Sequence, residues 1–257
     1  MVAWVRYWHE DHVKIGTIEG EAIAVHSGTL FSGPTPTGET VALTSTRLCI
    51  PCTPSKMICL WNNFPALAAK LAVQAPGEPL YFLKAPSSFI GHGEIIERPK
   101  YYDGKIVYEG ELGIVIGKRC ANVSEAQAPN YIFGYTCVND VTAADIINKN
   151  LTFAQWTRAK SFDTFGPFGP AIVTDLNPMT LRVRTLLNGE ERQNYAVSEM
   201  FFPPYQLVAL LSRDMTLLPG DVIACGTSVG VGSMKEPRNE IEIIIDGVGT
   251  LRNLFVQ

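Results

Sequence analysis

The chain has 257 residues, of which 46% are hydrophobic and 18% are charged, enough apolar material for one large domain or for one domain and a small appendage. A net charge of -4 and the absence of a Lys/Arg cluster argue against a nucleic-acid-binding surface. No apolar run reaches the roughly 20 residues of a membrane span, and residues 1–11 lack the pattern of a signal peptide, so we expect a cytoplasmic protein without a membrane partner.

The first 53 residues predict a small β-rich N-terminal domain. Residues 15–25 have the pattern of a hairpin with Glu19-Gly20 near its turn, and residues 32–38 are rich in Gly, Pro and Thr, as in a loop. The prolines of residues 51–54 indicate a joint. We therefore expect domains at residues 1–53 and 54–257.

The second part alternates many short strands with few helices, which predicts a mainly β fold with some α-helix (α+β), a sandwich or roll. Asn188-Gly189 is a strong type I′ hairpin signal. Apolar periodicity predicts helices at residues 65–73 and 204–213 and a helical turn at 140–148. The predicted strands cover residues 56–61, 80–84, 106–116, 131–138, 181–187, 190–195, 222–226, 240–246 and 249–255.

Two acidic residues interrupt the otherwise apolar segment at residues 106–116. Successive side chains of a strand point to opposite faces, so Glu109 and Glu111 are expected on one face of this strand. Two buried like charges need a cation or a proton, and carboxylates suit a hard divalent metal. A solvated polar face is the alternative interpretation, but the apolar flanks favour a metal.

Three other segments hold candidate site residues. Asp140 closes the apolar stretch 131–139, where an N-cap is the common use of Asp. Lys160 precedes a Gly/Pro-rich loop, which fits a site lysine and an exposed charge equally well. Thr227 lies in the glycine-rich segment 226–232, which permits close approach to a ligand but lacks the lysine of a phosphate loop. The six cysteines adjoin apolar residues and are expected to be buried, reduced thiols.

Several motifs in order resemble the fumarylacetoacetate hydrolase family, from about residue 54 to the C-terminus. They are Tyr108-Glu109-Gly110-Glu111-Leu112, Phe133-Gly134-Tyr135-Thr136, Asn139-Asp140, Lys160-Ser161-Phe162-Asp163, Gly169-Pro170, Asn188-Gly189-Glu190, Leu218-Pro219-Gly220-Asp221 and Cys225-Gly226-Thr227. The resemblance implies a mixed β-sandwich roll, a homodimer, and one divalent metal per site, Mg²⁺ or Mn²⁺ with Ca²⁺ as an alternative. It also implies a small 2-oxo acid as substrate.

Carried over to this sequence, the resemblance implies Glu109, Glu111 and Asp140 as metal ligands. Lys160 would be the catalytic residue that contacts the substrate, and Thr227 would hold a substrate carboxylate. A metal bound in this way acts as a Lewis acid toward a 2-oxo acid, and Lys160 adds positive charge where an enolate develops.

The chain departs from the family pattern where hydrolytic members carry a water-activating His and, three residues later, a Glu. Leu67 and Lys70 stand at these positions, and Ala144 and Ile147 replace an Arg and a Gln that contact substrate. His92 is a potential substitute base, although a surface-loop histidine is the favoured interpretation.

Three functions remain open from the sequence. Family membership favours a metal-dependent hydrolase that cleaves a C–C bond of an acylpyruvate or β-diketo acid. The missing dyad favours an isomerase or decarboxylase of an unsaturated 2-oxo dicarboxylic acid from aromatic catabolism, which needs no activated water. A non-catalytic ligand-binding relative is the third hypothesis, and the predicted metal ligands argue against it.

Overall fold

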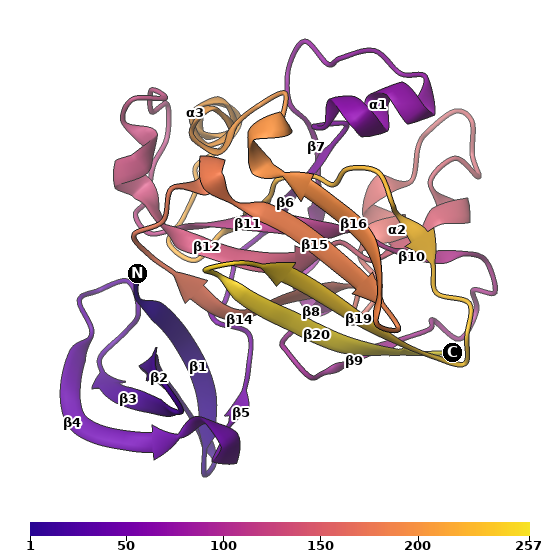
Figure 1. Ribbon diagram of the computed structural model, residues 1–257. Helices are drawn as coiled ribbons and strands as arrows, with labels where there is room; N and C mark the ends of the chain where they lie inside the picture. The colour runs from indigo at the N-terminus through magenta and orange to yellow at the C-terminus, as the bar shows by residue number, and fades with distance from the viewer.

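The computed structural model describes residues 1–257 and is built mainly from three β-sheets (Figure 1). The largest sheet has twelve strands. In order these are β4 (Thr35–Ala42), β3 (Ala22–Ser27), β2 (His12–Glu19), β1 (Ala3–His9), β14 (Gly166–Val173), β12 (Ile132–Asn139), β11 (Gly110–Ile116), β17 (Val222–Ala224), β6 (Met57–Trp61) and β7 (Leu80–Lys84), with β5 (Arg47–Leu48) beside β1 and β8 (Phe89–Ile90) beside β14.

The second sheet has five strands and packs against β11, β12 and β14 of the first, which makes a sandwich. Its strands are β16 (Glu190–Ala196), β15 (Arg182–Leu187), β19 (Arg238–Ile245), β20 (Gly249–Val256) and β9 (Ile95–Glu97). A third, small sheet consists of β13 (Thr142–Ala143), β10 (Ile106–Tyr108) and β18 (Gly232–Ser233). The predicted mainly β sandwich roll is therefore confirmed.

Strand β11 shows how the alternating sequence builds two cores. Leu112, Ile114 and Ile116 are fully buried in the large core between the two main sheets. Val115 belongs to a second, smaller core on the opposite face, and Glu111 points to that same face because side chains alternate along a strand. Burial of each large aliphatic side chain contributes about 1.5–3 kcal/mol, so this register is strongly fixed.

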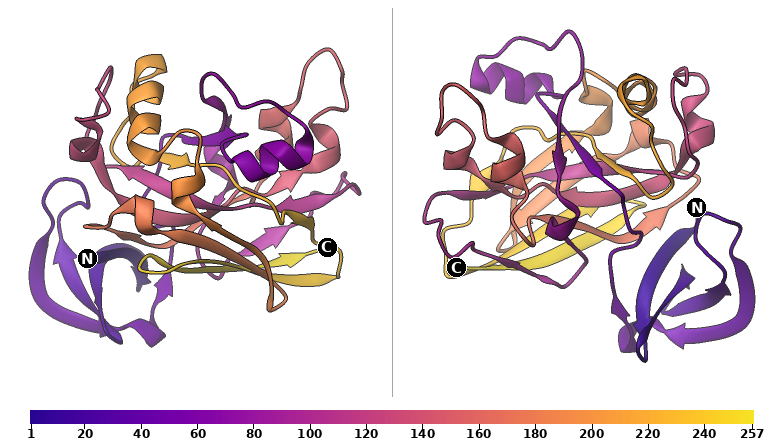
Figure 2. Two further views of the ribbon diagram at one scale, coloured as in Figure 1. Left: turned by 45° about the horizontal axis from the view of Figure 1, so that its top comes forward. Right: turned by 180° about the vertical axis from the view of Figure 1, so that it is seen from behind.

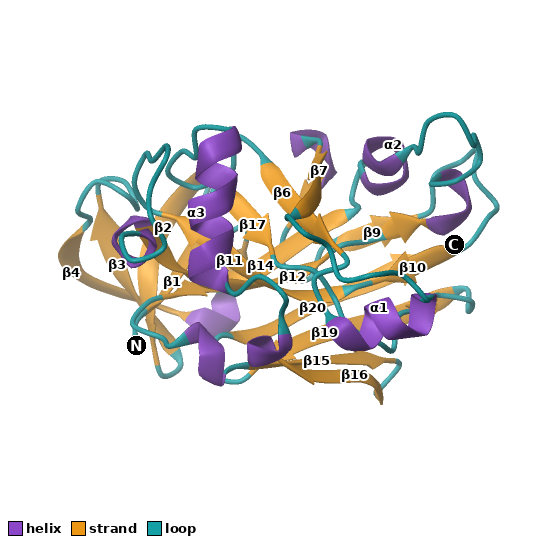
Figure 3. Cartoon of the chain, turned by 90° about the horizontal axis from the view of Figure 1, so that it is seen from above, coloured by secondary structure: helices purple, strands orange, loops and turns teal.

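Three α-helices cover the sheets: α1 (Pro65–Leu71), α2 (Trp156–Lys160) and α3 (Pro204–Asp214). Helix α3 has Pro at its first turn and packs Leu207, Val208 and Leu211 into the large core, as predicted. Figure 3 shows that α2 lies beside β7. None of the helices has the length and apolar character needed to cross a membrane.

The loop predicted at 32–38 is partly a strand, because β4 begins at Thr35 and pairs with β3. Two other predicted elements also differ from the structure. The strand expected at 106–116 breaks at Glu109, because β10 pairs with β13 and β18 while β11 enters the large sheet. The helical turn expected at 140–148 contains strand β13 and a single 3₁₀ turn, Ala144–Ile146. In both places pairing with distant segments overrides the local pattern.

Strands β1–β5 form a lobe beside the main body, which Figure 2 shows from two sides. The hairpin predicted in this lobe is present as β2 and β3. In the main body, Asn188 and Gly189 join β15 to β16 with φ of 52° and 79°, as a type I′ turn requires. All six cysteines are free and five are buried, as predicted. Strand β1 pairs with β14, so the large sheet continues from the main body into the lobe.

Candidate metal centre

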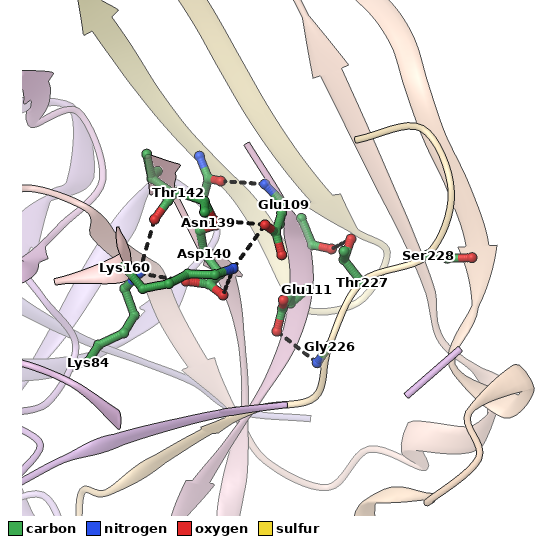
Figure 4. A network of polar contacts seen from close by, with 12 residues as sticks. Lys84, Glu109, Glu111, Asn139, Asp140, Thr142, Lys160, Gly226, Thr227 and Ser228 are labelled. Atoms are coloured by element: carbon green, nitrogen blue, oxygen red, sulfur yellow. Dashed lines mark hydrogen bonds and ion pairs between the residues drawn. The ribbon is translucent and has the colours of Figure 1, made fainter. Parts of the chain in front are cut away.

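Three carboxylates from separate segments meet at one point (Figure 4). Glu109 lies between β10 and β11, Glu111 lies on β11, and Asp140 directly follows β12. The backbone N–H of Asp140 donates to the carbonyl of Glu109 over 2.9 Å, which continues the antiparallel pairing of β11 with β12. As a result, one oxygen of each carboxylate lies within 4.8 Å of the other two. The fold thus brings together the three predicted ligands.

Glu111 is completely buried, and its environment disfavours its charge. Burial, together with the negative charges of Asp140 and Glu109, holds the pKa of Glu111 well above its ordinary value. Its Oε2 accepts a hydrogen bond of 2.8 Å from the N–H of Gly226, whereas its Oε1 has no partner. A buried carboxylate oxygen without a partner is costly unless a cation or a proton satisfies it.

Asp140 is also fully buried but is held by two ammonium groups. Lys84 Nζ lies 2.5 Å from Oδ1, and Lys160 Nζ lies 2.5 Å from Oδ2. Burial alone would raise the pKa of Asp140, but the positive charges of Lys160 and Lys84 outweigh it and hold that pKa below its ordinary value. Asp140 is therefore ionised and is not a helix cap.

Lys160, the last residue of α2, connects two of the carboxylates. Figure 4 shows its ammonium group between Glu109 and Asp140, and its Nζ lies 2.9 Å from Glu109 Oε1. Burial alone would lower the pKa of Lys160, but the negative charges of Asp140 and Glu109 raise it by a larger amount. The pKa is therefore above its ordinary value, and the ammonium group keeps its proton. The same Nζ lies 5.1 Å from the ring centroid of Phe82 on β7.

Supporting hydrogen bonds orient Glu109. Thr142 donates its hydroxyl to Glu109 Oε1 over 2.8 Å, and the backbone N–H of Glu109 donates to Asn139 Oδ1 over 3.1 Å. Sequence reasoning assigned no chemistry to Thr142, Asn139 or Lys84. The role of Lys84 could have been predicted from the sequence. Lys84 shares a strand face with the apolar Phe82, and a lysine on a buried face needs a buried anion.

Thr227 is buried near the carboxylates, but its hydroxyl is already paired. It donates to the carbonyl of Gly110 over 3.0 Å and accepts from Gln193 Nε2 over 2.8 Å. A substrate carboxylate would need the hydroxyl hydrogen of Thr227 to turn toward it. The hydroxyl of Tyr195 also donates to the Gly110 carbonyl, at 2.5 Å, so that carbonyl would stay paired after such a turn.

The structure also locates the positions where the chain departs from the family pattern. Leu67 is half-buried and Lys70 exposed, both on α1, and neither offers a base. Ala144 and Ile147 lie at the short turn after β13. His92 is half-buried, and its Nδ1 accepts the backbone N–H of Arg252 on β20 over 3.2 Å. The His92 ring is thus already hydrogen-bonded to a strand of the five-stranded sheet.

The residues at this centre fit a hard divalent cation. Three carboxylates offer only oxygen donors, the set that magnesium, manganese and calcium prefer. The unpartnered Oε1 of Glu111 is the atom that a cation would satisfy. Lys84 and Lys160 contact only two of the three carboxylates, so the lysines leave Glu111 without a positive partner.

Comparison with known proteins agrees with the fold. Residues 56–256 match the model of the fumarylacetoacetate (FAA) hydrolase C-terminal domain, and residues 3–51 match an Rv2993c-like N-terminal model. The chain belongs to the fumarylacetoacetate hydrolase family. The resemblance inferred from the motifs is confirmed, and the chain is an enzyme of this family, whose members include isomerases, decarboxylases and hydrolases.

Three relatives illustrate the range of the family. The oxaloacetate tautomerase YisK of Bacillus subtilis is 39% identical over 78% of this chain and 69% of its own. The 4-hydroxyphenylacetate degradation bifunctional isomerase/decarboxylase of Salmonella dublin is 39% identical over 78% of this chain and 46% of its own. The crystal structure of 5-carboxymethyl-2-hydroxymuconate delta-isomerase from Mycobacterium smegmatis superposes with a TM-score of 0.91 at 39% identity, covering 99% of both chains.

Proposed function

We propose that this protein is a divalent-metal-dependent isomerase of a 2-oxo acid, acting by keto–enol or double-bond tautomerisation. In the enol-to-keto direction the enol O–H loses its proton to solvent, which leaves an enolate. The electrons of the enolate C=C bond then form a new C–H bond with a proton donated by Lys160 Nζ, and Lys160 regains a proton from solvent. No bond to water forms. The reaction therefore needs an electron sink and a proton donor, but no activated water.

The observation that carries the proposal is the composition of the site. Three carboxylates and the protonated Lys160 are together, while the α1 positions of the water-activating pair hold Leu67 and Lys70. A positioned general base typically contributes about 10²–10⁴-fold to a rate. Without it, hydrolysis loses its main catalyst, whereas protonation of an enolate at carbon keeps Lys160 as its proton donor.

Each side chain has a defined part in the proposed reaction. Glu109, Glu111 and Asp140 would hold the metal, which when bound supplies Lewis-acid polarisation of the 2-oxo group. Lys160 Nζ holds its positive charge and its proton beside the enolate that develops. Lys84 neutralises Asp140 and fixes its direction. Thr227 would donate its hydroxyl hydrogen to the substrate carboxylate after that hydrogen turns away from the Gly110 carbonyl.

The names of the relatives support this function over C–C hydrolysis, our leading expectation from family membership. A tautomerase, a delta-isomerase and a bifunctional isomerase/decarboxylase are each 39% identical to this chain. Decarboxylation uses the same electron sink and differs in the bond that breaks. It is therefore the outcome to separate from isomerisation in the assay.

The test uses the purified protein with Mg²⁺ or Mn²⁺ and a panel of oxaloacetate, 2-oxo-heptenedioates and acylpyruvates. The proposal predicts an enol-to-keto change in ultraviolet absorbance without change of mass. Release of carbon dioxide identifies a decarboxylase, and two acid products identify a hydrolase. Either of these as the dominant reaction, or no turnover of the whole panel, contradicts the proposal.

Three further parts of the proposal concern the metal, the oligomeric state and the domain boundary. We propose Mg²⁺ or Mn²⁺ as the metal, since the donors are all carboxylate oxygens. We propose a homodimer on the family resemblance, tested by light scattering on a sizing column. We also propose a domain boundary near residue 53, which limited proteolysis between the lobe and the main body tests.

A further inference from the structure

An aromatic cavity lies one side chain away from the ammonium group of Lys160. Its volume is about 520 Å³. The lining residues are Trp61, Pro79, Leu80, Tyr81, Phe82 and Trp156. None of them carries a charge, and four are aromatic. Such a lining accepts apolar and planar groups and disfavours a carboxylate, which would lose its water without a cationic partner.

The rings of this cavity are ordered by contacts with one another. Phe82 and Trp156 stack with an interplanar angle of 15° and centroids 5.7 Å apart, and Trp61 lies 5.5 Å from Trp156. These rings come from β7, α2 and β6. Because three separate elements hold them, the aromatic wall exists before any ligand binds, which lowers the entropic cost of binding.

The cavity lies next to the candidate metal centre, and two residues connect the two sites. Phe82 lines the cavity, and its ring centroid lies 5.1 Å from Lys160 Nζ, which itself contacts Glu109 and Asp140. Trp156 and Lys160 are four residues apart on α2, so both project from the same side of that helix. A molecule whose polar end contacts Lys160 therefore has its other end near Phe82 and Trp156.

We propose that this aromatic cavity is the specificity pocket for the substrate tail, and that the preferred substrates are 2-oxo acids with an aryl or other planar, apolar tail. The inference rests on the proposed function for the position of the 2-oxo acid end. It then goes further, because it replaces the unsaturated 2-oxo dicarboxylic acid of the isomerase hypothesis with a monocarboxylic acid. Trp61, Phe82 and Trp156 are the residues that select the tail.

An adjoining cavity of about 740 Å³ is the main alternative position for the substrate tail. It shares Tyr81, Phe82 and Trp156 with the aromatic cavity, and its lining also includes Arg158 and Phe153. If Arg158 bound a carboxylate tail, dicarboxylic acids would be preferred. Phe153 is 71% exposed, so the aromatic surface could alternatively contact a second copy of the chain. The experiment below separates both arrangements from the proposal.

Binding of 2-oxo acids that cannot enolise tests the pocket without turnover. We would measure by calorimetry, in saturating Mn²⁺, the affinities for benzoylformate (aryl tail), mesoxalate (carboxylate tail) and glyoxylate (no tail). The wild-type protein is expected to bind benzoylformate at least about 10-fold more tightly than the other two. Trp156→Leu and Trp61→Leu are expected to weaken benzoylformate by about 10- to 30-fold and to leave glyoxylate unchanged. Trp8→Leu, in the N-terminal lobe, is the matched control.

Three other results would each overturn the pocket. Equal losses for benzoylformate and glyoxylate in both Trp variants would mean that the rings only support the centre. Preference for mesoxalate, lost in Arg158→Met, would assign the tail to the adjoining cavity. A change of oligomeric mass in the Trp variants would make the aromatic surface an interface between copies. If the wild type binds benzoylformate as expected but isomerises no enolisable 2-oxo acid, the pocket stands and the proposed function fails.

Discussion

The ammonium group of Lys84, from the edge strand β7, lies 2.5 Å from the carboxylate of Asp140, and both side chains are buried. Lys84 Nζ also donates to the carbonyl of Val141 over 3.2 Å. The two partners are 56 residues apart in the sequence. This ion pair therefore ties the far end of the large sheet to the candidate metal centre.

Replacing Lys84 with Met is expected to destabilise the metal-free protein by about 3 kcal/mol, because it leaves a buried carboxylate with one cation fewer. Urea unfolding monitored by fluorescence measures the change. The loss should shrink in saturating Mn²⁺, since a bound cation takes over part of the neutralisation. Arg184→Met removes an exposed ion pair with Glu191 and is the control, with a much smaller effect. Equal effects of the two substitutions would contradict the role of Lys84.

Replacing Glu111 with Gln is expected to stabilise the metal-free protein at neutral pH by about 1–3 kcal/mol, the cost of a buried polar group without a partner. The same change should abolish the stabilisation that Mn²⁺ gives to the wild type. Thermal unfolding with and without Mn²⁺ checks both effects. A variant that is less stable without metal, or that still responds to Mn²⁺, is incompatible with our account of Glu111.

The raised pKa of Glu111 also predicts that the stability of the metal-free protein depends on pH. Its pKa is raised in the folded protein, so the folded state binds this proton more tightly than the unfolded state does. The Glu111 contribution is therefore fully present below the ordinary carboxylate pKa and is lost as pH rises through the raised folded pKa. Melting temperatures of the metal-free wild type and Glu111→Gln, measured from pH 5 to 8, should converge toward low pH. Parallel curves would refute this linkage.

Restoring the missing dyad tests why hydrolysis is disfavoured. The double substitution Leu67→His and Lys70→Glu on α1 should raise acylpyruvate cleavage by about 10²-fold, the lower range of general-base catalysis, and leave isomerisation nearly unchanged. Product analysis of both reactions measures the two rates. A wild-type protein that already cleaves acylpyruvates as fast as it isomerises 2-oxo acids would remove the basis of this prediction.

The sequence predicted the β-rich fold and the Glu109/Glu111 pair from local patterns, whereas Asp140 was expected at the site only from the family resemblance, since its local pattern is that of a helix cap. Alternation along β11 identified Glu111 as an anion on a buried face, and Asn188-Gly189 identified a hairpin. The break at Glu109 was not predictable, since it depends on pairing of β10 with β13 and β18.

Residues that act across the fold were the ones sequence reasoning missed. Lys84 and Asp140 are 56 residues apart and meet only in the folded sheet, where β7 pairs with β6. The aromatic cavity likewise combines β6, β7 and α2, whose sequence separation conceals their contact. A pattern within one element gives the face of a side chain but not its distant partner.

Binding of Mn²⁺ to the metal-free protein, followed by calorimetry, tests the central claim most directly. The account predicts one Mn²⁺ per chain. Loss of a hydrogen bond that supports a metal ligand typically weakens metal binding about 10- to 100-fold. The substitutions Glu109→Gln, Glu111→Gln and Asp140→Asn should each weaken Mn²⁺ binding by more than this. Unchanged Mn²⁺ affinity in any of these three folded variants would contradict a metal centre built from these carboxylates.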